Sequence, residues 1–187
     1  MEFEGVGING AWLVRSPVHN DDRGYFREWF KVSEIATATG LAFHAQQANI
    51  SSSKKGVLRG IHYSLASEGQ GKWITCISGS IWDVVVDIRP TSPTFKKWVG
   101  FELNAMSGDS LFISEGLGHG FISLEHHSTV TYLLTSEYEP LKEFEIHPLD
   151  PDLAIDWPLK QILLSPKDAA APTLQQRLTA GNLKPQV

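Results

Sequence analysis

Four side chains of this sequence are of types that can move or stabilise protons, and each lies in or beside a segment typical of a β-strand. They are His62, Lys72, His119 and Tyr132. An imidazole titrates near neutral pH and can act as a general base, and ammonium or phenol groups can donate to negative charge that develops during a reaction. Taken alone, a strand histidine is more often structural than catalytic, and a strand tyrosine is usually part of the core or its rim. The role of these residues therefore depends on the elements that position them.

The segment around His62 contains a spacing problem. Arg59 and His62 are three residues apart, so strict strand alternation would place them on opposite faces. If both line one pocket, the strand needs a bulge, and Gly60 is the natural position for it. The alternative is that one of the two faces a different wall or a neighbouring subunit.

Further polar candidates lie before residue 50 and after residue 164. Gln47 and Asn49 share one face of a strand, which presents two polar groups together. The stretch Asp22-Arg23-Gly24 is typical of a turn with an ion pair, and Glu28 is expected further along the following strand. Ser165 to Asp168 forms a polar turn that leads into a helix.

The sequence offers little for metal, nucleophile or dinucleotide chemistry. A histidine metal site commonly has two histidines one residue apart with a carboxylate nearby, whereas His62 and His119 stand alone in their segments. We therefore expect no metal. Cys76 is the only cysteine, which excludes an internal disulfide, and its apolar neighbours predict a buried strand thiol. No glycine-rich phosphate loop or dinucleotide fingerprint occurs.

Composition limits the class of protein. The chain has 187 residues, of which 42% are hydrophobic and 20% charged, as in an ordinary globular protein with one core. Its net charge of −5 argues against a nucleic acid polymer as partner, because phosphate backbones are bound by clustered Lys and Arg. We find no signal peptide and no apolar stretch long enough to span a bilayer. A cytoplasmic enzyme or binding protein without membrane contact is expected.

The elements that must position these residues are mostly strands. Ile81 to Arg89 alternates, with Trp82, Val84, Val86 and Ile88 on one face and Asp83, Asp87 and Arg89 on the other. β-Branched and aromatic residues also dominate 73–77, 99–103, 111–113, 121–124 and 129–135, and Gly and Pro separate these runs at short intervals. Helices are expected only at Val32 to Thr39, ended by Gly40, and at Pro172 to Ala180. This pattern predicts an all-β fold, a sandwich or barrel in one domain over residues 1–187.

The ordered set of motifs resembles the dTDP-4-dehydrorhamnose 3,5-epimerases and their relatives in deoxysugar biosynthesis. The resemblance covers nearly the whole chain in the family's order. It is carried by Asp22 to Glu28, Gln47 to Ser51, Gly56 to Tyr63, Gly71-Lys72, Asp83 to Arg89, Ser92 to Phe95, Gly118 to Phe121, Asp150-Pro151, Ile155 to Pro158 and Ser165 to Asp168.

The resemblance implies a cupin jelly-roll, or double-stranded β-helix, with a few short helices. It also implies a homodimer with exchanged strands, no metal or organic cofactor, and a substrate such as dTDP-4-dehydro-6-deoxyglucose. A ketone at C4 of this sugar acidifies the protons at C3 and C5. By the resemblance His62 is the base, Asp168 orients its ring, Tyr132 is the acid on the other face, and Lys72 stabilises the negative oxygen.

The resemblance also implies residues that bind the nucleotide. Those suited to the diphosphate are Arg23, Arg59 and Lys167. Those expected around the base or pyrophosphate are Glu28, Gln47 and Asn49, and Tyr138 is expected to stack on thymine. Further binding positions are His119 and Glu143.

Departures from the family pattern flank the site at Ala48, Trp73, Leu117 and Leu133. They resemble the branch that serves secondary-metabolite sugars, in which only C3 or only C5 is inverted. We therefore expect a 3,5-epimerase, with a single-centre 3-epimerase or 5-epimerase as the first alternative. A cupin 3,4-ketoisomerase, a sugar-nucleotide-binding cupin without turnover and a metal-dependent cupin dioxygenase remain the other readings.

Overall fold

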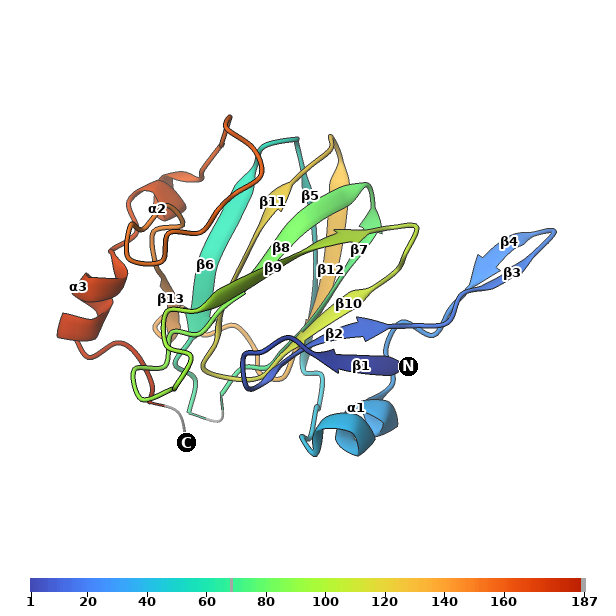
Figure 1. The fold of residues 1–187 in the computed structure, drawn as a ribbon, viewed down its shortest axis with the longest axis horizontal. Coiled ribbons are helices and arrows are strands. Elements are labelled where there is room, and N and C mark those ends of the chain that lie inside the picture. Colours follow the sequence, from blue (N-terminus) through green and yellow to red (C-terminus); the bar gives the residue numbers. More distant parts are fainter. Residues whose placement is uncertain (68, 186–187) are drawn as a thin grey trace.

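The fold is built from antiparallel sheets that face one another. The computed structural model describes residues 1–67 and 69–185, and in these the larger sheet has six strands in the order β1-β2-β10-β7-β12-β5. Its bounds are β1 (Glu2–Gly5), β2 (Ala11–Arg15), β10 (Ser110–Ile113), β7 (Lys72–Ser78), β12 (Ser128–Leu134) and β5 (Gln47–Ser53). The five-stranded sheet has the order β13 (Glu143–Glu145), β6 (Leu58–Ser64), β11 (Gly118–Ser123), β8 (Ser80–Val86) and β9 (Trp98–Asn104). The all-β prediction with few short helices is confirmed (Figure 1).

Alternating side chains fill three apolar layers. Between the sheets, β7, β8 and β12 contribute Ile74, Val85 and Val130, all fully buried. Outside the five-stranded sheet, a second cluster is covered by the C-terminal segment, and outside the larger sheet a third is covered by the helix α1 (Val32–Thr39). Cys76 is buried in the first cluster as predicted, and burial raises the pKa of its thiol to about 11.

The helices follow local signals closely but not completely. The predicted helix α1 is confirmed, and Gly40 ends it with φ of 73°, a left-handed conformation that glycine adopts without steric cost. The C-terminal helix α3 (Leu174–Thr179) begins later than predicted, because Thr173 caps it through a capping box and leaves Pro172 outside. In the described residues, no helix is long and apolar enough to cross a membrane.

A hairpin projects from the body of the molecule. Strands β3 (His19–Asp21) and β4 (Gly24–Phe26) pair with each other and join neither large sheet (Figure 1). The predicted turn at residues 22–23 is confirmed, but the prediction that Glu28 continues the strand is wrong, since β4 ends at Phe26. The side chains of Tyr25 and Phe26 are 57% and 65% exposed, which is unusual for aromatic residues on strands.

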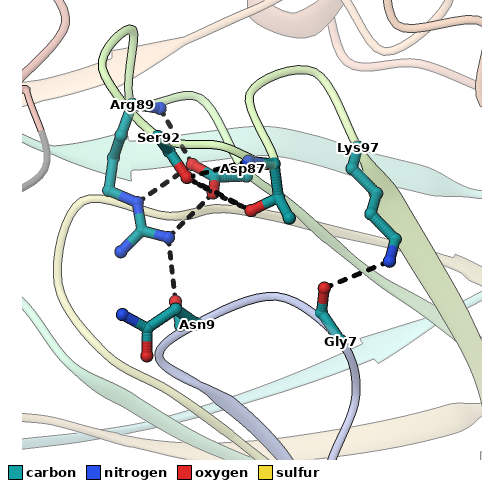
Figure 2. Close-up of polar contacts among 7 residues, drawn as sticks. Gly7, Asn9, Asp87, Arg89, Ser92 and Lys97 are labelled. Carbon is teal, nitrogen blue, oxygen red and sulfur yellow. Dashed lines mark hydrogen bonds and ion pairs between the residues drawn. The ribbon is translucent and has the colours of Figure 1, made fainter.

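A buried ionic network fastens the loop that follows β8. The predicted polar face of this strand is not solvent-exposed: Asp83 and Asp87 are fully buried and Arg89 is 6% exposed. The Arg89 guanidinium donates to both Asp87 carboxylate oxygens and to the Asn9 carbonyl, and Ser92 also donates to Asp87 (Figure 2). Thr94 is a further donor to Asp87. Burial opposes the charge on Asp87, yet these donors outweigh it and lower the pKa of its carboxyl group.

We expect Asp87→Asn to lower the free energy of unfolding by about 3–5 kcal/mol, because it leaves the buried Arg89 cation without its counter-ion. Since the folded-state pKa of Asp87 is lowered, its stabilisation is present above the unfolded pKa of about 3.9 and is lost as pH falls through the folded value. Urea unfolding at pH 7 and at pH 3.5 measures both effects, and the loss should be smaller at the lower pH. The matched control Asp152→Asn removes a half-exposed Lys96 ion pair and should cost less than about 1 kcal/mol. Equal losses in the two variants would contradict the role of the network.

Candidate active site

A cavity of about 330 Å³ opens between the two sheets. Strands of both sheets, the loop after β12 and the short helix α2 (Pro166–Ala169) line it. Its wall includes eleven residues that the sequence analysis selected: Gln47, Asn49, Arg59, His62, Lys72, His119, Tyr132, Tyr138, Glu143, Lys167 and Asp168. The structure therefore brings together residues separated by up to 121 positions, from Gln47 to Asp168, in one polar pocket.

Arg59 and His62 reach the same cavity because β6 carries the expected bulge. Arg59 pairs with Phe121 and His62 pairs with His119, so Gly60 and Ile61 lie opposite the single residue Gly120. Gly60 has φ of 127°, and a Cβ there would lie 2.6 Å from the Cα of Gly120. The position thus requires glycine, and the alternative in which Arg59 and His62 face different walls is wrong.

His62 is held by the carboxylate of Asp168, and both residues line the cavity. Its Nε2 lies 2.7 Å from Asp168 Oδ1. Burial opposes ionisation of Asp168, but hydrogen bonds from His62 and Ser165 outweigh it and lower the pKa of the carboxyl group. An ionised carboxylate can only accept, so Nε2 carries a hydrogen, and in the neutral imidazole Nδ1 is then the nitrogen with the lone pair. The His62 side chain is 43% exposed and lines the cavity, so its imidazole is open to a ligand bound there.

The short helix α2 fixes the position of Asp168 through the residues at its N-terminus. Ser165 is the N-cap and accepts from the backbone N–H of Asp168, while Pro166 occupies the first helical position. The Ser165 hydroxyl also donates to Asp168 Oδ2 at 2.9 Å. One short turn therefore orients both oxygens of the carboxylate that holds His62.

Tyr132 comes from the other sheet and supplies the opposite wall. It lies on β12 directly across from Asn49 on β5. Burial raises the pKa of the Tyr132 phenol, although a hydrogen bond with Asn49 and the charge of Arg59 oppose the rise. The phenol therefore stays protonated at neutral pH and can act as an acid.

Gln47 and Asn49 extend this wall as the spacing predicted. The Gln47 side-chain amide donates to Asn49 Oδ1 at 3.0 Å, and Gln47 Oε1 accepts from the backbone N–H of Tyr138 at 2.7 Å. Gln47 thus ties the loop after β12 to the cavity, with the Tyr138 ring 57% exposed at its mouth.

Lys72 is a buried cation at the start of β7. Only 8% of the residue is exposed, and burial lowers the pKa of its ammonium group to about 8, with Glu143 opposing the shift. Its Nζ donates to Gln70 Oε1 at 2.5 Å. A donor of this kind in a desolvated pocket can stabilise an oxygen that becomes negative.

His119 has its own buried carboxylate. Its Nε2 lies 2.9 and 3.0 Å from the two oxygens of Asp83, which is fully buried on β8. His119 and His62 lie side by side on β11 and β6, and each is paired with an aspartate from a different part of the chain. Among residues 1–67 and 69–185, no group of three His, Cys, Asp or Glu side chains is arranged to hold a metal ion.

Two cations complete the cavity wall near α2 and β6. Arg59 Nε donates to Ser53 Oγ at 3.1 Å, and Lys167 Nζ lies 3.1 Å from Glu145 Oε2. The Lys167 side chain is 58% exposed, so its charge remains available to an anionic ligand at the opening.

Two selected residues lie outside this cavity. Arg23 is at the tip of the projecting hairpin, where its side chain is 90% exposed and bonded to Asp21. Glu28 lies beyond the hairpin and pairs with Lys31 at 3.7 Å. The prediction of a surface turn with an ion pair at Asp22-Arg23-Gly24 is therefore confirmed for the single chain.

Gln70, Asp83 and Ser165 contribute polar groups to the site, but no role in it was predicted for them from the sequence. Ser165 had a usable signal, because Ser-Pro followed by an acidic residue is a helix-start pattern that orients that acidic side chain. Asp83 had a weaker one as an acidic residue inside an apolar strand. Gln70 lies between two glycines in a loop, and nothing local marks it as buried.

Comparisons with known proteins show the family and the fold of this chain. Residues 6–176 match the family model described as dTDP-4-dehydrorhamnose 3,5-epimerase. A curated dTDP-4-dehydrorhamnose 3-epimerase of Streptomyces niveus is 43% identical over 98% of this chain and 88% of its own length. The structure of the Mycobacterium tuberculosis rmlC epimerase has a TM-score of 0.97 and 41% identity, covering 99% of this chain and 94% of that one.

A ligand-bound structure is also similar. The crystal structure of the Legionella pneumophila dTDP-6-deoxy-D-glucose-3,5-epimerase RmlC in complex with dTDP-4-keto-L-rhamnose has a TM-score of 0.94 and 40% identity, covering 100% of this chain and 98% of that one. The cupin jelly-roll prediction is confirmed by these likenesses.

Proposed function

The chain belongs to the dTDP-4-dehydrorhamnose 3,5-epimerase family and is a dTDP-4-keto-6-deoxyhexose epimerase, and from this premise we propose that it inverts both C3 and C5 of dTDP-4-dehydro-6-deoxyglucose. The observation that carries the proposal is the position of His62, held by Asp168 on one wall of the cavity, with Tyr132 on the other sheet. A base and an acid on opposite walls are what inversion of a carbon centre requires.

The proposed chemistry uses four side chains. His62 Nδ1 removes a proton from a carbon next to the C4 ketone, and the bonding electrons move into the ketone to form an enolate. Lys72 donates to the enolate oxygen, where negative charge appears only as the proton leaves. Tyr132 returns a proton to the opposite face of the carbon. Since C3 and C5 both flank C4, the same oxygen is stabilised in either inversion.

The test is incorporation of solvent deuterium. Incubating the protein with dTDP-4-dehydro-6-deoxyglucose in deuterium oxide should remove the proton NMR signals of H3 and H5 as both carbons exchange. Loss of neither signal would overturn the epimerase assignment for this substrate.

A single-centre 3-epimerase is the second candidate. The Streptomyces niveus relative named as a 3-epimerase is 43% identical to this chain, close to the 41% of the M. tuberculosis epimerase. Loss of the H3 signal with retention of H5 would favour this reading. Product analysis would also separate both candidates from a 3,4-ketoisomerase, whose carbonyl leaves C4.

We propose that residues 1–187 form one cupin-type domain that works as a homodimer with exchanged hairpins. The β3–β4 hairpin carries two exposed aromatic rings, and Ile50 is 67% exposed on β5, which is an edge strand of the larger sheet. An unpaired edge with an exposed apolar side chain is a surface that a second copy can cover. In this arrangement the hairpin of one copy would reach β5 of the other and bring Arg23 and Glu28 toward the partner's cavity.

If Arg23 serves the partner's site, Arg23→Ala should raise KM for the dTDP-sugar roughly tenfold or more, because a charged hydrogen bond to the diphosphate is worth about 1.5–3 kcal/mol. The turnover number should change little. Mixing Arg23→Ala with His62→Asn protein, after refolding together, should restore wild-type KM at half of the sites in mixed dimers. No gain on mixing, or a monomer in light scattering at micromolar concentration, would contradict the exchanged dimer.

A further inference from the structure

Gln70 occupies an unusual position for an uncharged side chain, between a buried cation and a carboxylate. It is 5% exposed and lies just before β7, two residues from Lys72. Its Oε1 accepts from Lys72 Nζ, and its Nε2 donates to Glu143 Oε1 at 3.3 Å and to Ser136 Oγ at 3.1 Å. Both ends of one amide are therefore used.

The chemistry of the neighbours fixes the orientation of this amide. The Lys72 ammonium can only donate and so must face the amide oxygen, whereas an ionised Glu143 can only accept and must face the amide nitrogen. Glu143 Oε1 accepts a second hydrogen bond, from the Ser64 hydroxyl at 2.9 Å. Any other residue type at position 70 loses the hydrogen bond to Lys72 or the one to Glu143, or replaces it with a repulsive contact.

Lys72 and Glu143 do not neutralise each other in this arrangement. In the described part of the chain, Lys72 forms no ion pair within 4.0 Å, and Gln70 is its hydrogen-bond partner. Two of the three ammonium hydrogens thus stay free for another acceptor. The other ionisable groups on the cavity wall are Arg59, His62, His119, Tyr132, Tyr138, Lys167 and Asp168.

We propose that Gln70 is a positioning residue that holds the Lys72 ammonium toward the substrate oxygen and separates it from the Glu143 carboxylate. The proposal rests on the proposed function for its catalytic consequence. A direct Lys72–Glu143 pair would offset the positive charge that the enolate needs, and the ammonium would turn away from the reacting oxygen. Gln70 prevents this by bonding to both groups at once.

Gln70→Met removes both contacts at similar volume and should lower kcat roughly 100-fold, as misplacement of a catalytic group by about 1 Å can do, with KM nearly unchanged. Gln70→Glu instead places a carboxylate beside Lys72 and raises its pKa. Because the wild-type pKa is lowered to about 8, activity that needs the charged form falls above about pH 8, and in Gln70→Glu this basic limb should move to higher pH. Ser136→Ala is the matched control, since it removes only the third contact of the amide.

A second readout is independent of turnover. NMR titration of ¹³C- and ¹⁵N-labelled lysine, with the Lys72 signal assigned from Lys72→Met, follows the ammonium group directly. We expect its midpoint to rise in Gln70→Glu and to stay near the wild-type value in Ser136→Ala. This titration can be performed even if the protein fails to exchange the dTDP-sugar, so failure of the proposed function and failure of this inference are distinguishable.

Unchanged Lys72 titration in Gln70→Glu, or a Gln70→Met enzyme with wild-type kcat and only a lower Tm, would overturn the inference. If Gln70 keeps Lys72 from Glu143, the loss of kcat caused by Gln70→Met should be smaller in a Glu143→Gln background. Independent, additive losses would mean that Gln70 does not act through this pair.

Discussion

Replacing His62 with asparagine should abolish exchange of solvent deuterium at C3 and at C5. The variant keeps a group that can hydrogen-bond to Asp168 but has no lone pair basic enough to remove a carbon-bound proton. We expect the exchange rate to fall on the order of 10⁴-fold, the upper end of what a positioned general base contributes. Proton NMR in deuterium oxide measures both carbons in one experiment.

Retained binding must accompany this loss. Calorimetric titration with dTDP should give a Kd close to that of the wild-type protein. His126→Asn is a suitable control, since His126 is exposed in the loop between β11 and β12 and should exchange deuterium normally. An asparagine variant at position 62 that exchanged either carbon at nearly the wild-type rate would exclude His62 as the base.

Tyr132→Phe should separate exchange from inversion. Without the phenol, His62 can still remove a proton and return a deuteron to the same face, so label enters the carbon while its configuration is retained. Inversion should slow by roughly 10²–10⁴-fold, the range for loss of a general acid. Proton NMR coupling constants of the recovered sugar distinguish retained from inverted centres.

The same variant also reports on regiochemistry. If inversion disappears at C5 and persists at C3, Tyr132 serves one centre and another donor serves the second. Tyr63→Phe is the matched control: this tyrosine lies next to His62 on β6, but its hydroxyl donates to the Asn182 carbonyl outside the cavity. It should cost about 1 kcal/mol of stability and leave inversion intact. Wild-type inversion of both centres in Tyr132→Phe would remove Tyr132 from the mechanism.

Local features of the fold could be predicted from the sequence because their causes are local. Gly40 ends α1 where an αL residue is needed, and a bulge at Gly60 could be predicted because Arg59 and His62 are three positions apart. Gln47 and Asn49 share a face because strands alternate. Each of these depends on a few neighbouring residues.

Non-local contacts could not be predicted in this way. Asp168 meets His62 across 106 residues of sequence, and only the family resemblance suggested their association. Asp83 and Asp87 were placed on a polar strand face, yet both are buried because His119 and Arg89 supply their partners. Arg23 and Glu28 matched the family motif, but in the single chain Arg23 lies at the tip of the projecting hairpin and Glu28 lies just beyond it, both outside the cavity. The exchanged dimer proposed above would bring them to a partner's cavity.

The bulge at Gly60 shifts the alternation of side chains along β6 by one residue. The odd-numbered Arg59 before it and the even-numbered His62 after it both face the cavity. Ile61 and Tyr63 accordingly pack into the cluster under the C-terminal segment. Deletion of one residue here would therefore exchange the two faces downstream, turning an imidazole into the apolar layer and a tyrosine into the pocket. The number of residues between Arg59 and His62 therefore decides which side chains of β6 face the substrate.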